Sequence, residues 1–295
     1  MIFFPNKYAY NKDDLPFDGG LKQFSNVVIA GERSIIFNRH KGEFFFTKGA
    51  KYQVESTMPK CVHHGKTLKE RVLCFPGFNH ANWYHVVADM GFQMFLAKQR
   101  NLVGAVILPE CMKLFGPAFL QFFKLFEFKL YFVQHPRKAQ KISEVVCFDR
   151  FTGRLSDAIE GGVLDEEISQ YFSFLEDCFE RSSYAKKASK YGEKIFSTRR
   201  GKDSRVYENV SEVESEYQSN GYQVVHFGGM NVFEQMAVMK NATHIAGFHG
   251  ANLTNLIFAH QCTHIEELIT RELSGDFKTI AIHRNIQHSR RKLSG

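Results

Sequence analysis

Short apolar runs alternate with helical patterns along most of this chain. Compact runs of β-branched residues end at Pro or Gly, as where 104–108 meets Pro109, and such runs are typical of strands. Apolar residues recur at three- and four-residue steps from Trp83 to Phe95, which predicts a helix over 82–98. Strands and helices that follow one another in this way predict an α/β architecture with a parallel sheet.

The same patterns predict the other elements. Strands are expected at 26–30, 43–47, 71–75, 104–108, 129–133, 144–147, 194–198, 222–226, 243–247 and 263–268, the last of these being the final strand. Helices are expected at 82–98, 117–126, 166–190, 211–219, 231–240 and 251–258. The second half has the rhythm of a doubly wound nucleotide-binding domain. A domain boundary is expected near Gly161-Gly162, which gives two α/β domains with a cleft between them.

Composition narrows the protein class. The chain has 295 residues, of which 44% are hydrophobic and 23% charged, as in ordinary globular proteins. This length exceeds one ordinary core, so two domains or one large α/β unit are expected. No stretch reaches the ~18–20 uncharged apolar residues of a membrane span, and residues 1–5 lack the basic start of a signal peptide. We therefore expect a cytoplasmic protein.

The positive charge is concentrated in one window. The whole chain has a formal net charge of +7, and nine basic against two acidic residues between Arg181 and Arg205 account for all of it. Such a local excess indicates an anionic ligand at one place. A solvated basic helix followed by a loop is the alternative.

The first candidate site is a strand-to-helix turn. Its sequence is Gly247-Phe248-His249-Gly250-Ala251-Asn252-Leu253-Thr254-Asn255. A turn of this kind presents backbone N–H groups and the positive end of the helix dipole, which together bind phosphate. Gly250 permits a close approach of the ligand, and His249 can donate a hydrogen bond to a phosphate oxygen. A tight turn with a capping histidine is the alternative.

The second candidate site follows the strand predicted at 194–198. Its sequence is Ser197-Thr198-Arg199-Arg200-Gly201-Lys202-Asp203-Ser204-Arg205. An arginine at the carboxyl end of such a strand faces the ligand crevice, and a guanidinium pairs bidentately with diphosphate oxygens. A nucleoside diphosphate is the ligand that these two sites predict together. An exposed basic loop is the alternative for the second site alone.

The third candidate site lies at the start of the helix predicted over 82–98. His85 and Asp89 are four residues apart and share one helix face, with Asn82 about one turn earlier. An imidazole beside a carboxylate can act as a general base that deprotonates a hydroxyl. A helix start with core-facing aromatics and a surface histidine is the alternative.

Metal-ligating patterns are weak in this sequence. The histidine pairs are His63-His64, His80 with His85, and His260 with His264. No pair of acidic residues stands out that would hold a metal–diphosphate complex. We expect neither a metal nor another cofactor.

The three sites, in this order, resemble glycosyltransferase family 61. The matching segments are Asn82-Trp83-Tyr84-His85 with Asp89, Phe196-Ser197-Thr198-Arg199-Arg200, Phe233-Glu234-Gln235, Gly247 to Asn255, and Glu266-Glu267-Leu268. The resemblance implies a GT-B type glycosyltransferase with two Rossmann-like domains facing a cleft. Residues 1–162 would form the acceptor-side domain, and residues 163–295 the nucleotide-sugar domain. The stretch after 268 is short, so the helix that closes such folds is expected to be short or missing.

The resemblance also implies an activity and its residues. It implies inverting, metal-independent transfer from a nucleotide sugar, with a UDP-sugar as first choice, in the synthesis of capsule, lipopolysaccharide or exopolysaccharide. His85 and Asp89 would form the catalytic base. The implied donor-binding residues are Asn82, Ser197, Arg199, Arg205, Glu234, His249, Gly250, Ala251, Asn252 and Glu267. Among these, Glu234 or Glu267 would hold the ribose or base, and the arginines and the turn at Gly250 would hold the diphosphate.

The expected partners are a nucleotide-sugar donor and a glycan or lipid-linked glycan acceptor, with no nucleic acid. Peripheral contact with the inner membrane is left open, because lysines interleave the aromatic run over 115–132. Two other functions also remain open. One is a catalytically inactive nucleotide-binding module, and the other is a basic RNA-binding protein that uses the 181–205 window.

Overall fold

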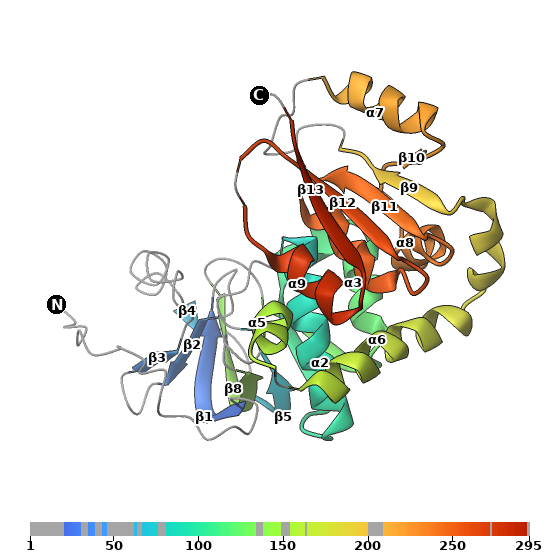
Figure 1. Cartoon of the computed structure of the whole chain (residues 1–295). Coiled ribbons are helices and arrows are strands. Elements are labelled where there is room, and N and C mark those ends of the chain that lie inside the picture. The colour runs from blue at the N-terminus through green and yellow to red at the C-terminus, as the bar shows by residue number, and fades with distance from the viewer. Residues whose placement is uncertain are drawn as a thin grey trace.

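The structure is a computed structural model that describes residues 21–30, 35–38, 43–45, 62–63, 67–75, 81–133, 138–148, 154–162, 164–199, 209–271 and 273–293. In this part of the chain, two β-sheets have a layer of helices between them (Figure 1). The expected α/β class is therefore confirmed.

The first sheet is mixed and lies in the amino-terminal half. Its eight described strands are β1 (Leu21–Ala30), β2 (Ile35–Asn38), β3 (Glu43–Phe45), β4 (Val62–His63), β5 (Leu68–Leu73), β6 (Ala105–Pro109), β7 (Lys129–Val133) and β8 (Lys138–Phe148). The strand order is β3-β2-β1-β8-β5-β6-β7, with β4 beside β8. Strands β8, β5, β6 and β7 run parallel, whereas β1 is antiparallel to both β8 and β2.

The second sheet is wholly parallel. Its strands are β9 (Lys194–Ser197), β10 (Gln223–Val225), β11 (His244–Phe248), β12 (His264–Ile269) and β13 (Gln287–Lys292). They are ordered β10-β9-β11-β12-β13, which is the 2-1-3-4-5 order of a doubly wound sheet. The expectation that 263–268 is the final strand is wrong, because β13 adds to the edge of the sheet beside β12.

The helices occur mostly where the apolar periodicity places them. They are η2 (His85–Met90), α2 (Gly91–Gln99), η3 (Glu110–Leu114), α3 (Pro117–Lys124), α5 (Leu155–Glu160), α6 (Asp165–Glu180), η4 (Ala185–Lys190), α7 (Val210–Ser219), α8 (Val232–Met239), η5 (Ala251–Phe258) and α9 (Asp276–His283). The closing helix that the resemblance leaves short or missing is present as α9. The single helix expected over 166–190 is wrong, because α6 ends at Glu180. There the Ser182 hydroxyl accepts a hydrogen bond from the backbone N–H of Tyr184, as serine does in turns.

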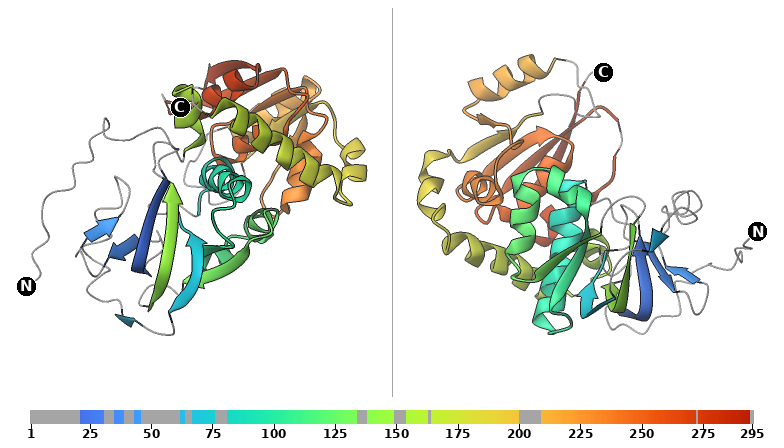
Figure 2. Two further views of the ribbon diagram at one scale, coloured as in Figure 1. Left: turned by 90° about the horizontal axis from the view of Figure 1, so that it is seen from below. Right: turned by 180° about the vertical axis from the view of Figure 1, so that it is seen from behind.

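The two faces of the second sheet have different coverings. Alternate residues of the strands point to opposite faces, so Ile195 and Ile245 pack toward α8 and η5, whereas Phe196 and Phe248 pack toward α7. The first of these faces belongs to a continuous apolar core that also includes α2, α3, α6 and one face of the first sheet. Figure 2 shows this shared helix layer from two further directions. The division at residues 162/163 stays a prediction.

Candidate active site

Two loops meet at the carboxyl edge of the second sheet. Residues Ser197–Arg199 leave β9, and residues His249–Ala251 leave β11, the strand beside it. The strand that follows β9 in sequence, β10, lies on one side of β9, and the next strand, β11, lies on its other side. The strand order therefore reverses between β9 and β11, which is the topological switch point of the sheet. Ligands of doubly wound sheets bind outside the strand ends at this point.

Glycines permit the close approach of these two loops. A Cβ atom on Gly247 would lie 2.7 Å from the backbone oxygen of Ser197, its neighbour across the strands. A Cβ atom on Gly250 would lie 2.9 Å from Nη1 of Arg199, so the guanidinium group covers this glycine. The same Nη1 donates to the backbone oxygen of His249 over 3.1 Å. The predicted arginine and the predicted turn are therefore in contact.

The turn also begins a helix, as predicted. Ala251 is the first residue of the 3-10 helix η5, and Asn252 lies in its first turn. The first N–H groups of such a helix have no partner within the helix and attract anions. Together with the Arg199 guanidinium, they form a cationic corner at the carboxyl edge of the sheet.

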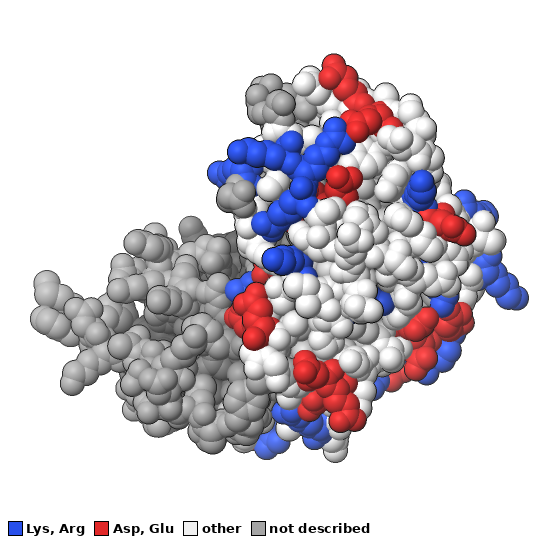
Figure 3. Space-filling view, in the orientation of Figure 1, with Lys and Arg blue, Asp and Glu red and all other residues white. Residues whose placement is uncertain are grey.

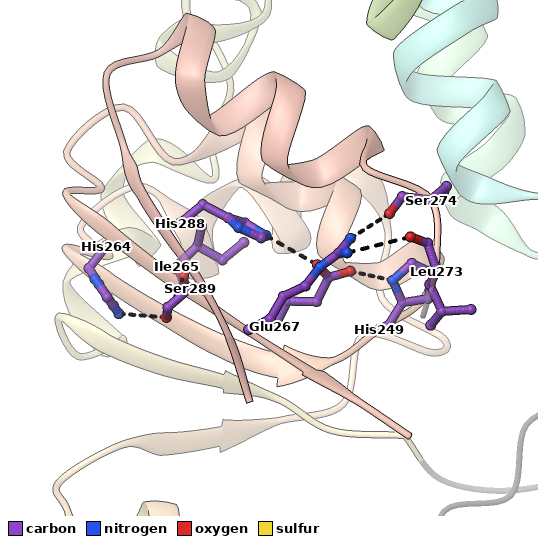
Figure 4. A network of polar contacts seen from close by, with 9 residues as sticks. His249, His264, Ile265, Glu267, Leu273, Ser274, His288 and Ser289 are labelled. Atoms are coloured by element: carbon purple, nitrogen blue, oxygen red, sulfur yellow. Dashed lines mark hydrogen bonds and ion pairs between the residues drawn. The ribbon is translucent and has the colours of Figure 1, made fainter. Parts of the chain in front are cut away.

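A buried carboxylate holds His249 in place. Glu267 on β12 has no exposed side-chain surface, and its Oε1 atom pairs with Nδ1 of His249 (Figure 4). Its Oε2 atom pairs with Nε2 of His288 over 3.1 Å and with Nε of Arg290 over 2.7 Å. Arg290 also donates to the backbone oxygens of Leu273 at 3.4 Å and Ser274 at 2.6 Å. The loop between β12 and α9 is thereby tied to the same carboxylate.

This bonding determines the charge of Glu267. Burial by itself would raise the pKa of its carboxyl group. The hydrogen bonds from its three partners outweigh that effect and lower the pKa to about 2. The group is therefore an anion at neutral pH, and it fixes the His249 ring through Nδ1.

The third predicted pair, His85 and Asp89, is formed in a π-helical turn. Nδ1 of His85 lies 2.7 Å from Oδ2 of Asp89, whose side chain is fully buried, while that of His85 is 25% exposed. The other carboxylate oxygen of Asp89 accepts from the backbone N–H of Leu155 over 3.1 Å, at the start of α5. A carboxylate held from both sides fixes the orientation and tautomer of the imidazole.

A contact from another helix accounts for the π-helical turn. The backbone N–H of Gly91 bonds to the oxygen of Val86, five residues earlier, and the Tyr171 hydroxyl donates to the Val87 oxygen over 2.5 Å. A side chain that inserts into the helix ladder in this way widens the turn. A Cβ atom on Gly91 would lie 2.3 Å from the Tyr171 hydroxyl, so only glycine fits at this point. π-Helical turns of this kind are frequent at functional sites.

Two aromatic rings join the histidine sites. The centroid of Tyr84 lies 5.5 Å from that of His85 and 5.8 Å from that of Phe277 on α9, and Phe277 lies 5.4 Å from His249. The two histidine–carboxylate pairs therefore flank one buried pair of rings. The structure thus brings the first, second and third predicted sites together.

Two other predicted residues, Asn82 and Glu234, form hydrogen bonds at helix starts. The side-chain oxygen of Asn82 accepts from the N–H of Tyr84 over 2.9 Å at the helix start. Glu234 forms a capping box with Asn231 at the start of α8. The Ser197 side chain is buried. Arg205 lies outside the described residues.

The fold divides the basic window. Lys186, Lys187 and Lys190 precede β9 on η4, at the amino end of the strand, whereas Arg199 follows its carboxyl end. The single anion-binding region expected from the charge count is therefore split between two ends of the sheet. Figure 3 shows a further group of basic side chains over β13, whose sequence includes Arg290, Arg291 and Lys292.

Several site residues were not predicted. Sequence reasoning stopped at Leu268 and so missed Phe277, His288 and Arg290. The available signal was the apolar periodicity of 276–283, which predicts a helix, whereas the polar strand after it has no such signal. In the described part of the chain, no group of three or more His, Cys, Asp or Glu side chains is placed to hold a metal ion. Nor does any helix described there have the length and apolarity that crossing a bilayer requires.

Comparison with known proteins gives one result. A family model described as Glycosyltransferase 61 matches residues 83–265, more than half of the chain. The matched segment includes the His85–Asp89 pair, Arg199 and the His249 turn. No curated protein matches the chain.

Proposed function

We propose a reaction for this chain, which belongs to glycosyltransferase family 61 and is a glycosyltransferase. The chain would transfer a sugar from a nucleotide-sugar donor to a glycan acceptor. A UDP-sugar is the first choice of donor, and the proposed reaction inverts the anomeric carbon without a metal ion. The observation that supports this most is the contact between Arg199 and the His249–Gly250 turn at the switch point of the parallel sheet.

The leaving diphosphate would bind at this corner. The Arg199 guanidinium and the N–H groups at the start of η5 are donors fixed before the reaction begins. Such donors stabilise negative charge that develops in a transition state, and they cost no reorganisation at that moment. In its imidazolium form, which donates from both ring nitrogens, His249 would hold Glu267 through Nδ1 and add a third donor to the diphosphate through Nε2. These groups would stabilise the negative charge on the leaving diphosphate, as a divalent cation does in other transferases.

The acceptor hydroxyl would react on the His85 side. Because Asp89 holds Nδ1, proton transfer falls to Nε2 of His85. The hydroxyl loses its proton to this nitrogen and its oxygen bonds to the anomeric carbon. The bond from that carbon to the diphosphate breaks, and the nucleoside diphosphate leaves with the electron pair. One displacement from the face opposite the nucleotide inverts the configuration.

We also propose the GT-B arrangement, with residues 1–162 on the acceptor side and 163–295 on the donor side. In its support, the anion-binding groups lie on the second sheet, and the His85 helix connects two strands of the first. The acceptor would be a glycan or a lipid-linked glycan in capsule, lipopolysaccharide or exopolysaccharide synthesis. The enzyme would work in the cytoplasm and at the inner face of the membrane.

Thermal unfolding tests the donor site. The protein is melted with UDP, GDP, CMP, ADP or dTDP, each in EDTA and in magnesium. A ligand at about 100 times its Kd adds about 2.7 kcal/mol of stability, which raises the melting temperature measurably. We expect UDP to raise it equally in both solutions, and Arg199→Ala to remove the effect. A rise that needs magnesium would overturn metal independence, and no rise with any nucleotide would overturn the donor site.

Hydrolysis of a donor tests the reaction. With water as acceptor, a UDP-sugar of α configuration should first release the β anomer, as followed by NMR. First release of the α anomer would rule out the single displacement. Nucleotide binding with neither hydrolysis nor transfer would favour the inactive binding module.

A further inference from the structure

A buried chain of hydrogen bonds links the His85 helix to the donor side. Nε1 of Trp83 donates to Oδ1 of Asn255 over 2.8 Å, and Nδ2 of Asn255 donates to Oε1 of Gln235 over 2.9 Å. Nε2 of Gln235 then donates to the backbone oxygen of Met230 over 3.3 Å. All three side chains are buried, and Asn255 is fully so. This hydrogen-bond chain therefore connects the helical turn just before η2 with η5 and α8.

The donors and acceptors along this hydrogen-bond chain can be arranged in only one way. An indole N–H can only donate, so the Asn255 oxygen must face Trp83 and its NH₂ group must face Gln235. The oxygen of Gln235 then accepts, and its NH₂ group is left to donate to Met230. Neither side-chain amide can flip without leaving a buried polar group unpaired, which is destabilising.

The first bond of this chain, from Trp83 to Asn255, lies between the two proposed sites. Trp83 lies two residues before His85, and Asn255 lies on η5, the helix whose start forms the diphosphate corner. The Trp83 ring also packs against the rings of Phe119 and Phe122, at centroid distances of 5.1 and 5.8 Å. A bond between Trp83 and Asn255 therefore fixes the His85 helix relative to Gly250.

We propose that Trp83 and Asn255 are positioning residues for the transfer reaction. They set the His85–Asp89 pair against the donor turn without touching the substrate, and this role rests on the proposed function of both sites. Misplacement of a reacting group by about 1 Å can cost about 100-fold in rate, so loss of the bond should lower turnover far more than it lowers nucleotide affinity.

Three variants separate positioning from general stability. Asn255→Leu removes the bond and keeps the side-chain size, whereas Trp83→Phe removes the donor and keeps an aromatic ring. Phe122→Leu is the matched control, because it loosens the packing around Trp83 and leaves the hydrogen bonds of Trp83, Asn255 and Gln235 intact. Each variant is compared in urea unfolding, in UDP affinity by calorimetry, and in the kcat and KM of UDP-sugar hydrolysis well below the melting temperature.

Two spectroscopic readouts need no substrate. Trp83 is the single tryptophan of the chain, so its fluorescence reports the bond directly. The ring resonances of His85 in histidine-labelled protein, assigned with His85→Gln, report the placement of the base. Asn255→Leu should shift the Trp83 emission and should shift or broaden the His85 signal, whereas Phe122→Leu should leave the His85 signal as in the wild type.

The expected kinetic result is a split between kcat and affinity. Asn255→Leu and Trp83→Phe should lower kcat about tenfold or more and change the Kd of UDP by less than about threefold, and Phe122→Leu should keep kcat within about twofold. The proposal is overturned if the two bond-breaking variants match Phe122→Leu in kcat and keep the wild-type His85 signal. A wild type that neither binds UDP nor hydrolyses a UDP-sugar overturns the proposed donor chemistry instead, and the His85 signal then decides the positioning role alone.

Discussion

Replacing Glu267 by glutamine tests the charge of the buried carboxylate that pairs with His249. Glutamine keeps the shape of the side chain and stands in for the protonated acid. The side chain of Glu267 has no exposed surface, so its interactions are little screened by solvent. Lowering the pKa from the ordinary value of 4.5 to about 2 corresponds to about 3 kcal/mol of stability at neutral pH.

The sign of the pH dependence follows from the direction of this shift. The pKa is lower in the folded than in the unfolded protein, so the stabilisation is complete above about pH 4.5 and is lost as the pH falls toward about 2. Glu267→Gln should therefore lower the free energy of unfolding by about 3 kcal/mol at pH 7 and by about 2 kcal/mol at pH 3.5.

Urea unfolding followed by circular dichroism at both pH values measures this difference. Glu212→Gln, at an exposed position on α7, is the control and should change the free energy of unfolding by less than about 0.5 kcal/mol. An equal cost of Glu267→Gln at pH 7 and pH 3.5 would refute the reasoning, because the stabilisation would then not depend on the charge.

Three further predictions concern single residues. Arg199→Ala should lower kcat about 100-fold or more with little change in melting temperature, because the leaving diphosphate loses the guanidinium that stabilises its negative charge. Unchanged turnover in steady-state kinetics would exclude this role of Arg199. His85→Ala should lower kcat about 10²–10⁴-fold and alter the pH–rate profile, and a wild-type profile would argue against a base at this position. Gly91→Ala should lower the free energy of unfolding by about 1–3 kcal/mol in urea, since the new Cβ atom meets the Tyr171 hydroxyl at 2.3 Å. Gly104→Ala, with its nearest contact at 3.6 Å, is the control for that clash, and an equal effect of both substitutions would contradict it.

Local patterns predicted much of the fold. The strands of the second sheet from β9 to β12 occur within one or two residues of the apolar runs that predicted them, because a buried parallel strand needs a continuous apolar stretch. The helix start after Gly250 and the arginine after β9 were also predicted, since both follow from the strand-to-helix rhythm of the chain.

The errors have physical reasons. The expected helix over 166–190 has a continuous helical composition, but the Ser182 hydroxyl bonds to the backbone N–H of Tyr184 and the helix ends before it. The last β-α unit was missed because β13, with the sequence QHSRRK, is polar and lacks an apolar run. An edge strand gains its stability from pairing with β12, which no local pattern reveals.

Sequence by itself determined the class of the fold, the positions of most elements, and the residues at the ends of β9 and β11. These features depend on side chains that are near one another along the chain. Tertiary structure alone decided which of those residues meet. It joined Trp83 to Asn255, 172 positions away, and gave Glu267 its partners in the turn after β11 and on β13. It also separated the lysines of η4 from Arg199, because a strand carries neighbouring residues to opposite edges of a sheet.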